Sequence, residues 1–177
     1  MLGKTAEAKM ASRFAFCKPY TLLLLIVIFG LFLRLVFFSG MGISDSLVYS
    51  KTANDINEGK GIDPNSTLTL STRLGLVLPT AFSYKLFGIN DFSSAIFVLI
   101  TSIASIILMF YFGKLLFNGK IGLIAAFLLS FFPLDVVYAT KLVSDLPSGF
   151  FMALGVYIFL YAEMKRKMKY GLDYMLS

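Results

Sequence analysis

A carboxylate followed by regularly spaced residues is the feature of this sequence best suited to chemistry. Asp45 lies just after the first long apolar segment, residues 20–38. It is followed by Tyr49, Ala53, Ile56, Gly59 and Gly61. Because residues three and four apart share one face of a helix, this spacing predicts a short helix with Asp45 at its head, which the two glycines end. A carboxylate held in this way at a membrane surface suits a site that acts on a lipid-linked substrate.

The residue inventory narrows the chemistry further. The sequence contains no histidine, and Cys17 is its only cysteine. Histidine is the usual general base and the commonest metal ligand, and one cysteine can form neither an internal disulfide nor a cysteine-based metal site. A catalytic base in this protein must therefore be a carboxylate or come from the substrate.

Long apolar segments must position these residues. The mean hydropathy is +0.81 and 58% of the residues are hydrophobic. A bilayer core about 30 Å thick needs roughly 20 apolar residues per helix, and segments 20–38, 92–112, 121–137 and 146–161 meet or approach that length. The sequence predicts an all-α polytopic membrane protein with about four transmembrane helices.

Arg34 lies near one end of the first segment, where we expect its side chain to snorkel to the membrane surface. The alternative is that Arg34 pairs with an outer-loop carboxylate.

The charges alternate between the two sides of these segments. The formal net charge is +6. Basic residues lie before the first segment, between the second and third, and after the fourth (Lys4, Lys9, Arg13, Lys18, Lys114, Lys120, Lys165, Arg166, Lys167 and Lys169). Acidic residues collect on the other side (Asp45, Asp55, Glu58, Asp63, Asp91, Asp135 and Asp145). The positive-inside rule then predicts a cell- or ER-membrane protein with both termini in the cytoplasm and loop 39–91 outside. This distribution argues against nucleic acid as a partner.

The chain divides into a basic cytoplasmic lead (1–18), a membrane domain (19–162) that includes outer loop 39–91, and a basic cytoplasmic tail (163–177). The outer loop is predicted to contain two short interfacial helices, about 45–58 and 72–87. Residues 59–71 between them are rich in turn formers and include the glycosylation-acceptor pattern Asn65-Ser66-Thr67. A tight hairpin at 117–119 is predicted to join the second and third segments, and Pro133 to bend or end the third.

Four passages in a fixed order carry a resemblance to a known family. They are Arg34-Leu35, the pattern from Asp45 to Gly61, Arg73-x-Gly75-x3-Pro79 leading into Tyr84-x-Leu86-Phe87-Gly88, and Pro133 followed by Ser144-Asp145-x-Pro147. Together they resemble the amino-terminal part of integral-membrane glycosyltransferases of the GT-C fold, which include protein O-mannosyltransferases and bacterial lipid A aminoarabinose transferases. The resemblance implies a polyprenyl-phosphate-linked sugar donor, a protein, lipid or glycan acceptor on the non-cytoplasmic side, and inversion at the transferred sugar.

The resemblance also implies that Asp45 is the catalytic residue. A carboxylate in this position orients or deprotonates the acceptor hydroxyl as it attacks. The alternative is that Asp45 caps its helix, a contribution of about 1 kcal/mol. Many relatives carry a second acidic residue next, where this chain has Ser46. Because one carboxylate alone is a poor site for a divalent cation, no metal ligand is assigned, and a cation requirement stays open.

Four further residues are candidates for substrate binding. Arg73 can neutralise the lipid phosphate, since a guanidinium matches phosphate in a bidentate manner; otherwise it anchors its helix at the interface. Lys141 is a second candidate for that role. Tyr49 offers a hydroxyl to substrate or packs in the core, and Asp145 binds substrate or caps the fourth segment.

The number of segments leaves a rival function open. Enzymes of the GT-C fold usually have more than four spans, so the resemblance implies that the chain is the amino-terminal portion of a longer enzyme. A non-catalytic flippase for lipid-linked sugars, or a membrane assembly subunit, is the alternative that fits a four-span protein. Such proteins do not need the Asp45 pattern in a long outer loop.

Overall fold

The computed structural model describes residues 2–42, 44–61 and 73–176, and their regular structure is helical throughout. The helices are α1 (Leu2–Val36), α2 (Asp45–Asn57), α3 (Leu74–Phe87), α4 (Asp91–Leu116), α5 (Gly119–Ser130), α6 (Pro133–Tyr138) and α7 (Asp145–Leu176). This confirms the all-α class predicted from the sequence. Part of the predicted outer loop 39–91, including Asp63 and the Asn65-Ser66-Thr67 pattern, lies outside the described residues.

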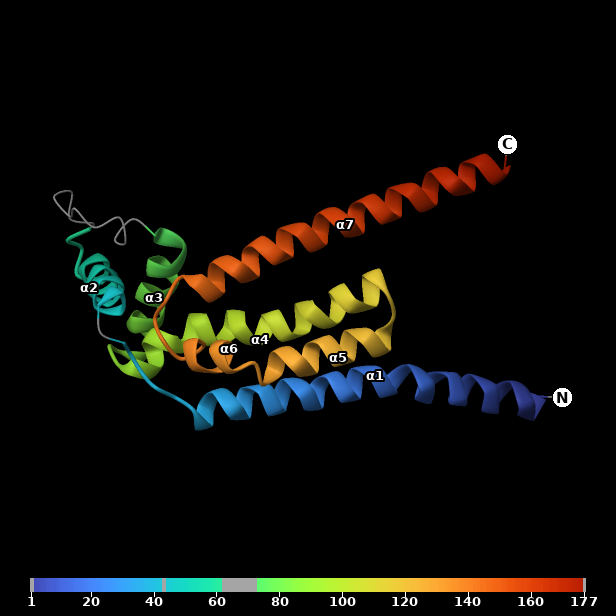
Figure 1. Ribbon diagram of the computed structural model, residues 1–177, viewed down its shortest axis with the longest axis horizontal. Coiled ribbons are helices and arrows are strands. Elements are labelled where there is room, and N and C mark those ends of the chain that lie inside the picture. Colours follow the sequence, from blue (N-terminus) through green and yellow to red (C-terminus); the bar gives the residue numbers. More distant parts are fainter. Residues whose placement is uncertain (1, 43, 62–72, 177) are drawn as a thin grey trace.

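The helices form an elongated bundle with two distinct ends (Figure 1). Helices α1, α4, α5 and α7 run along its length. Helices α2 and α3 gather at one end, beside the start of α4, whereas both termini and the α4–α5 turn lie toward the other end. The acidic first residues of α2 and α4 are therefore separated from the lysines of the α4–α5 turn by the length of the bundle.

Three helices are long and apolar enough to cross a membrane by length and composition: Pro19–Val36 within α1, Asp91–Leu116, and Asp145–Lys167 within α7. They correspond to the first, second and fourth predicted segments. Helices α1 and α7 also extend beyond those segments, so the predicted lead and tail continue the helices that they flank.

The third predicted segment, 121–137, is divided and does not form one spanning helix. Helix α5 ends at Ser130 and α6 begins at Pro133. Proline disfavours the helical conformation in the residue before it, and Phe132 accordingly adopts an extended backbone with φ −60° and ψ 118°. Because α5 is about 18 Å long at 1.5 Å per residue, it is shorter than a bilayer core.

The α4–α5 hairpin depends on a cap and on two glycines. The Asn118 side chain accepts hydrogen bonds from the backbone N–H groups of Lys120 and Ile121, both at 3.0 Å, which satisfies donors at the start of α5. A Cβ atom added to Gly113 would lie 2.5 Å from the Cα atom of Gly122, and one on Gly122 would overlap the Phe110 carbonyl oxygen. The two helices can approach this closely only because both positions lack a side chain.

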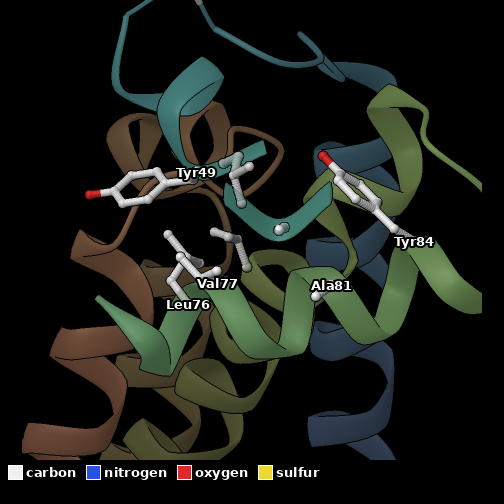
Figure 2. Packing of buried hydrophobic residues seen from close by; sticks show 8 residues of the cluster. Tyr49, Leu76, Val77, Ala81 and Tyr84 are labelled. Atoms are coloured by element: carbon white, nitrogen blue, oxygen red, sulfur yellow. The ribbon is translucent and has the colours of Figure 1, made fainter. Parts of the chain in front are cut away.

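A hydrophobic cluster joins α2, α3, α4 and the α6–α7 connection (Figure 2). Its buried members are Tyr49, Ala53, Leu76, Val77, Ala81, Tyr84, Val98 and Leu142. The Tyr84 hydroxyl lies 2.8 Å from the Ser50 hydroxyl and 2.7 Å from that of Ser94, so polar contacts reinforce the packing. On α3, Leu74, Leu78 and Phe82 are exposed, whereas the buried residues of this helix are Leu76, Val77, Thr80, Ala81, Ser83 and Tyr84.

Candidate functional site

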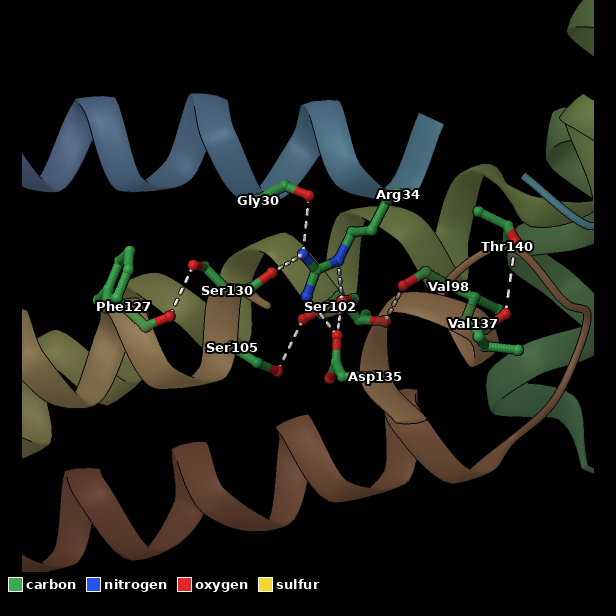
Figure 3. A network of polar contacts seen from close by, with 11 residues as sticks. Gly30, Arg34, Val98, Ser102, Ser105, Phe127, Ser130, Asp135, Val137 and Thr140 are labelled. Carbon is green, nitrogen blue, oxygen red and sulfur yellow. Dashed lines mark hydrogen bonds and ion pairs between the residues drawn. The ribbon is translucent and has the colours of Figure 1, made fainter. Parts of the chain in front are cut away.

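A buried arginine organises the middle of the bundle (Figure 3). Arg34 is 0% exposed, and its Nη2 atom forms an ion pair with the Asp135 carboxylate. Its Nε atom donates to Ser102 Oγ at 2.7 Å, and Nη1 donates to the Gly30 and Ser130 carbonyl oxygens at 2.8 and 3.0 Å. The prediction that Arg34 snorkels to the surface is therefore wrong. Its buried donors need acceptors, and α6 supplies the carboxylate of the alternative interpretation.

This network fixes the start of a connection that reaches the end of the bundle where α2 and α3 lie. Asp135 belongs to α6, and residues after that helix bind both the segment before α2 and α2 itself. The Ser39 N–H donates to Thr140 Oγ1 at 3.2 Å, and Ser46 Oγ donates to the Leu142 carbonyl oxygen at 3.0 Å. The start of α2 is thus held against the segment that leads into α7.

Arg73, Tyr49 and Ser144 form a polar cluster at that end, called the Arg73 cluster below. Arg73 Nη1 donates to Tyr49 Oη at 2.9 Å and to Ser144 Oγ at 2.6 Å. The cluster brings together residues before α3, in α2 and before α7, which are far apart in the sequence. Arg73 is exposed, and its Nε and Nη2 atoms make no hydrogen bond within the described part of the chain. Among the described residues, the Nε–Nη2 edge of the guanidinium thus has no partner, and this is the edge that suits an anion.

Tyr49 packs in the core, as one of its two predicted roles requires, and its binding of substrate stays a prediction. It is 1% exposed and belongs to the buried cluster of α2 and α3. Its ring packs beside Leu76 and Val77, and its hydroxyl points away from the cluster (Figure 2). That hydroxyl is the one bound to Arg73. Packing of the ring therefore places a polar group at the surface where Arg73 lies.

Asp45 is the first residue of α2, one helical turn before Tyr49. Residues four apart lie on the same face of a helix, so Asp45 and the Arg73 cluster share one side of α2. The Asp45 side chain is exposed and accepts a hydrogen bond from Ser44 Oγ at 3.2 Å. The cap position belongs to Ser44, which makes no side-chain cap bond. The structure therefore does not support capping as the role of Asp45.

The backbone directly before Asp45 is strained. Ser44 has φ 83° and ψ −115°, and it is the only non-glycine residue with positive φ in the described part of the chain. Side chains other than glycine rarely adopt this conformation, which costs about 1–3 kcal/mol. Such strain commonly lies beside functional residues, and here it sets the direction in which α2 begins.

The two remaining candidates lie near the start of α7. Asp145 is its first residue, directly after Ser144, and it lines a cavity of about 230 Å³ that is also lined by Asp135 and Ser105. The Lys141 ammonium lies over the Tyr138 ring, 5.4 Å from its centroid. Among the described residues no hydrogen bond or ion pair joins Asp145 or Lys141 to the Arg73 cluster: Asp145 lines the cavity beside Asp135, and Lys141 lies against an aromatic ring.

The other acidic residues of α2 lie further along the helix. Glu58 follows its last turn and pairs with Lys60, and this hydrogen bond lowers the pKa of the Glu58 carboxyl below its ordinary value. Asp55 is half-buried and forms no ion pair with the described residues. No group of three or more His, Cys, Asp or Glu residues that could hold a metal ion is found in the described part of the chain.

Sequence reasoning missed Asp135 and Ser144 as organising residues. Asp135 carried a signal, because it is a carboxylate two residues after Pro133 in an otherwise apolar segment, and a buried charge needs a partner. Ser144 was visible only as the neighbour of Asp145. The contact that defines its role joins residues 71 positions apart, which local patterns do not reveal.

Comparison with known families gives a match over the second part of the chain. The family model described as dolichyl-phosphate-mannose-protein mannosyltransferase matches residues 77–177, more than half of the chain. The matched segment includes Asp135, Lys141, Ser144 and Asp145, and it begins after Asp45, Tyr49 and Arg73. No curated protein and no solved structure matches the chain significantly.

Proposed function

Because the chain belongs to the dolichyl-phosphate-mannose-protein mannosyltransferase family, a family of glycosyltransferases, we propose that it takes part in transferring a mannosyl group from a polyprenyl-phosphate donor to an acceptor hydroxyl. One observation carries the assignment of the site. An exposed arginine, tied to Tyr49 and Ser144, lies on the side of α2 that begins with an exposed aspartate. A cation for the leaving phosphate and a base for the nucleophile therefore lie at one end of the bundle.

The proposed reaction assigns one role to each of these charges. Asp45 accepts the proton of the acceptor hydroxyl while the hydroxyl oxygen forms a bond to the anomeric carbon. The bond between that carbon and the phosphate oxygen of the donor breaks on the opposite face, so the configuration inverts. The electron pair leaves with the prenyl phosphate. Arg73 stabilises the negative charge that develops there through the Nε–Nη2 edge of its guanidinium.

The residues around Arg73 support this role by fixing its position. An arginine side chain loses considerable rotamer freedom when it is held in place. The bonds to Tyr49 and Ser144 hold the guanidinium in one position. Asp145, next to Ser144, is proposed to accept hydroxyl groups of the sugar. Lys141 is kept only as a second cation for the phosphate, since the structure places it against Tyr138.

An apolar groove is available for a prenyl chain. It has a volume of about 550 Å³ and lies between α1, α5 and α6, lined by Phe29, Leu33, Phe37, Phe127, Phe131, Pro133, Val136 and Val137. Prenyl chains are apolar, and burying them against such a surface is favourable.

We propose that the end of the bundle that holds Asp45 and Arg73 faces the non-cytoplasmic side, because the lysines of the α4–α5 turn lie at the opposite end.

The experiment compares Asp45→Asn with Asp55→Asn, a carboxylate on the same helix outside the proposed site. Membranes containing the protein as its gene encodes it receive labelled polyprenyl-phosphate mannose and a hydroxyl-bearing peptide. We expect Asp45→Asn to lower transfer about 100-fold or more, the usual contribution of a general base, and Asp55→Asn to leave it unchanged. Unchanged transfer by Asp45→Asn at equal expression removes the catalytic assignment. Movement of the lipid-linked sugar across vesicles without transfer by the wild type would instead favour a flippase.

A further inference from the structure

The end of the bundle opposite the Arg73 cluster contains a second open cavity. It has a volume of about 540 Å³ and lies between the start of the α1 span and the first turns of α5, lined by Pro19, Leu22, Asn118, Gly119, Lys120 and Leu123. Figure 1 shows this part of α1 alongside the α4–α5 turn, far from α2 and α3. The proposed transfer reaction uses none of these residues.

The lining of this cavity changes from apolar to cationic. Pro19, Leu22 and Leu123 form an apolar wall, and Leu22 is 50% exposed. Asn118 and Lys120 supply the polar part at the start of α5. The apolar span of α1 begins at Pro19, so this change of character falls at the level where a bilayer core would meet its headgroups. A long lysine side chain at that level extends toward the headgroups.

Of the two lysines at the α4–α5 turn, Lys120 is the one available to an anion. Lys120 is exposed and forms no ion pair with the carboxylates that the structure describes. Lys114, on the other side of the turn, is held instead by Tyr20, whose hydroxyl accepts from its ammonium at 2.8 Å. Between Asp91 and Asp135 the sequence contains lysines at 114 and 120 and no acidic residue. The α4–α5 turn therefore carries positive charge and contributes no carboxylate that would compete for it.

We propose that this cavity binds an anionic phospholipid of the adjacent leaflet. Its phosphate lies against the Lys120 ammonium, and one acyl chain lies along Pro19, Leu22 and Leu123. Charge complementarity selects an anionic over a zwitterionic headgroup, because basic pockets between transmembrane helices attract anionic lipids. The volume is within the range of about 300–1,000 Å³ typical of small-molecule sites. The bound lipid would fill the open side of the α1–α5 contact.

The test measures lipid binding to the purified, delipidated protein by native mass spectrometry. Phosphatidylglycerol and phosphatidylcholine with identical acyl chains are the two probes. We expect phosphatidylglycerol to bind more tightly. Lys120→Gln should weaken its binding about five-fold, the effect of one basic residue near a lipid surface. Lys51→Gln, which removes an exposed lysine on α2, is the matched control and should not change it.

A second variant tests the acyl-chain wall. Leu22→Trp places a larger side chain in the cavity at an exposed position, so the fold should tolerate it, and we expect it to reduce the binding of phosphatidylglycerol while Lys120 is intact. Glycerol 3-phosphate, which has no acyl chains, should not compete. The proposal is overturned if phosphatidylcholine binds as tightly as phosphatidylglycerol, if Lys120→Gln behaves like Lys51→Gln, or if glycerol 3-phosphate competes.

Discussion

Replacing Asp135 tests the buried network that positions the candidate site. Asp135→Leu replaces the carboxylate in α6 with an apolar side chain of similar size. Arg34 would keep its bonds to Ser102, Gly30 and Ser130. Its charge, however, would have no counter-ion while the side chain is fully buried. The uncompensated charge is the dominant cost.

The expected loss of folding free energy in Asp135→Leu follows from the burial of Arg34. Removing one partner of a buried ion pair costs about 3–5 kcal/mol, which lowers the folding equilibrium constant by roughly 10²- to 10⁴-fold. Replacing both charges should recover most of this loss, since buried pairs exchanged for apolar residues are often neutral. The double variant Arg34→Met with Asp135→Leu should therefore be more stable than Asp135→Leu alone, which is a non-additive result.

The assay uses a cysteine buried in α4. In a Cys17→Ser background, Val98→Cys places a thiol at a position with 0% exposure, and its reaction with a maleimide reports the unfolded fraction during a titration with sodium dodecyl sulfate. Asp55→Leu, which removes a half-buried carboxylate outside the network, is the control and should change stability by about 0.5 kcal/mol or less. A loss below about 1 kcal/mol for Asp135→Leu would show that Arg34 reaches water or headgroups by snorkelling, and would refute the reasoning.

Three further substitutions are expected to shift the same titration. Gly122→Ala should destabilise the protein by about 1–3 kcal/mol because its Cβ would overlap the Phe110 carbonyl oxygen; wild-type stability would mean that α4 and α5 can separate without loss. Tyr84→Phe leaves the Ser50 and Ser94 hydroxyls without their shared partner and should cost about 1–3 kcal/mol, whereas a neutral result would show that water replaces it. Ser44→Gly should stabilise by about 1 kcal/mol, because glycine adopts positive φ without strain; a destabilised variant would contradict the strain argument.

Local patterns predicted much of the helical framework. The apolar lengths located the helices that became α1, α4 and α7, and the Asp45 pattern predicted α2 almost residue by residue, because these features depend on neighbours three or four positions away. Pro133 predicted an interruption in the third segment. That α6 then turns Asp135 inward toward Arg34 depends on packing between helices, and no local pattern contains that information.

In the candidate site, too, local patterns identified the residues but not the contacts between them. Asp45, Tyr49, Arg73 and Asp145 were singled out from their residue types and order. Their arrangement depends on contacts between distant segments: Arg73 reaches Tyr49 and Ser144 across separations of 24 and 71 residues. Lys141 was chosen by charge alone, and the structure places its ammonium over the ring of Tyr138, three residues earlier in the chain. Charge identifies candidates for phosphate binding, but packing decides which of them is free.

The most direct measurement of the central claim is the dependence of mannosyl transfer on donor concentration for Asp45→Asn and Arg73→Gln, each in the protein as its gene encodes it. We expect Asp45→Asn to lower kcat about 100-fold or more with the donor KM nearly unchanged, since Asp45 acts on the acceptor. Arg73→Gln should raise the donor KM, because it removes a charge that binds the lipid phosphate. Wild-type kcat in Asp45→Asn would contradict the account.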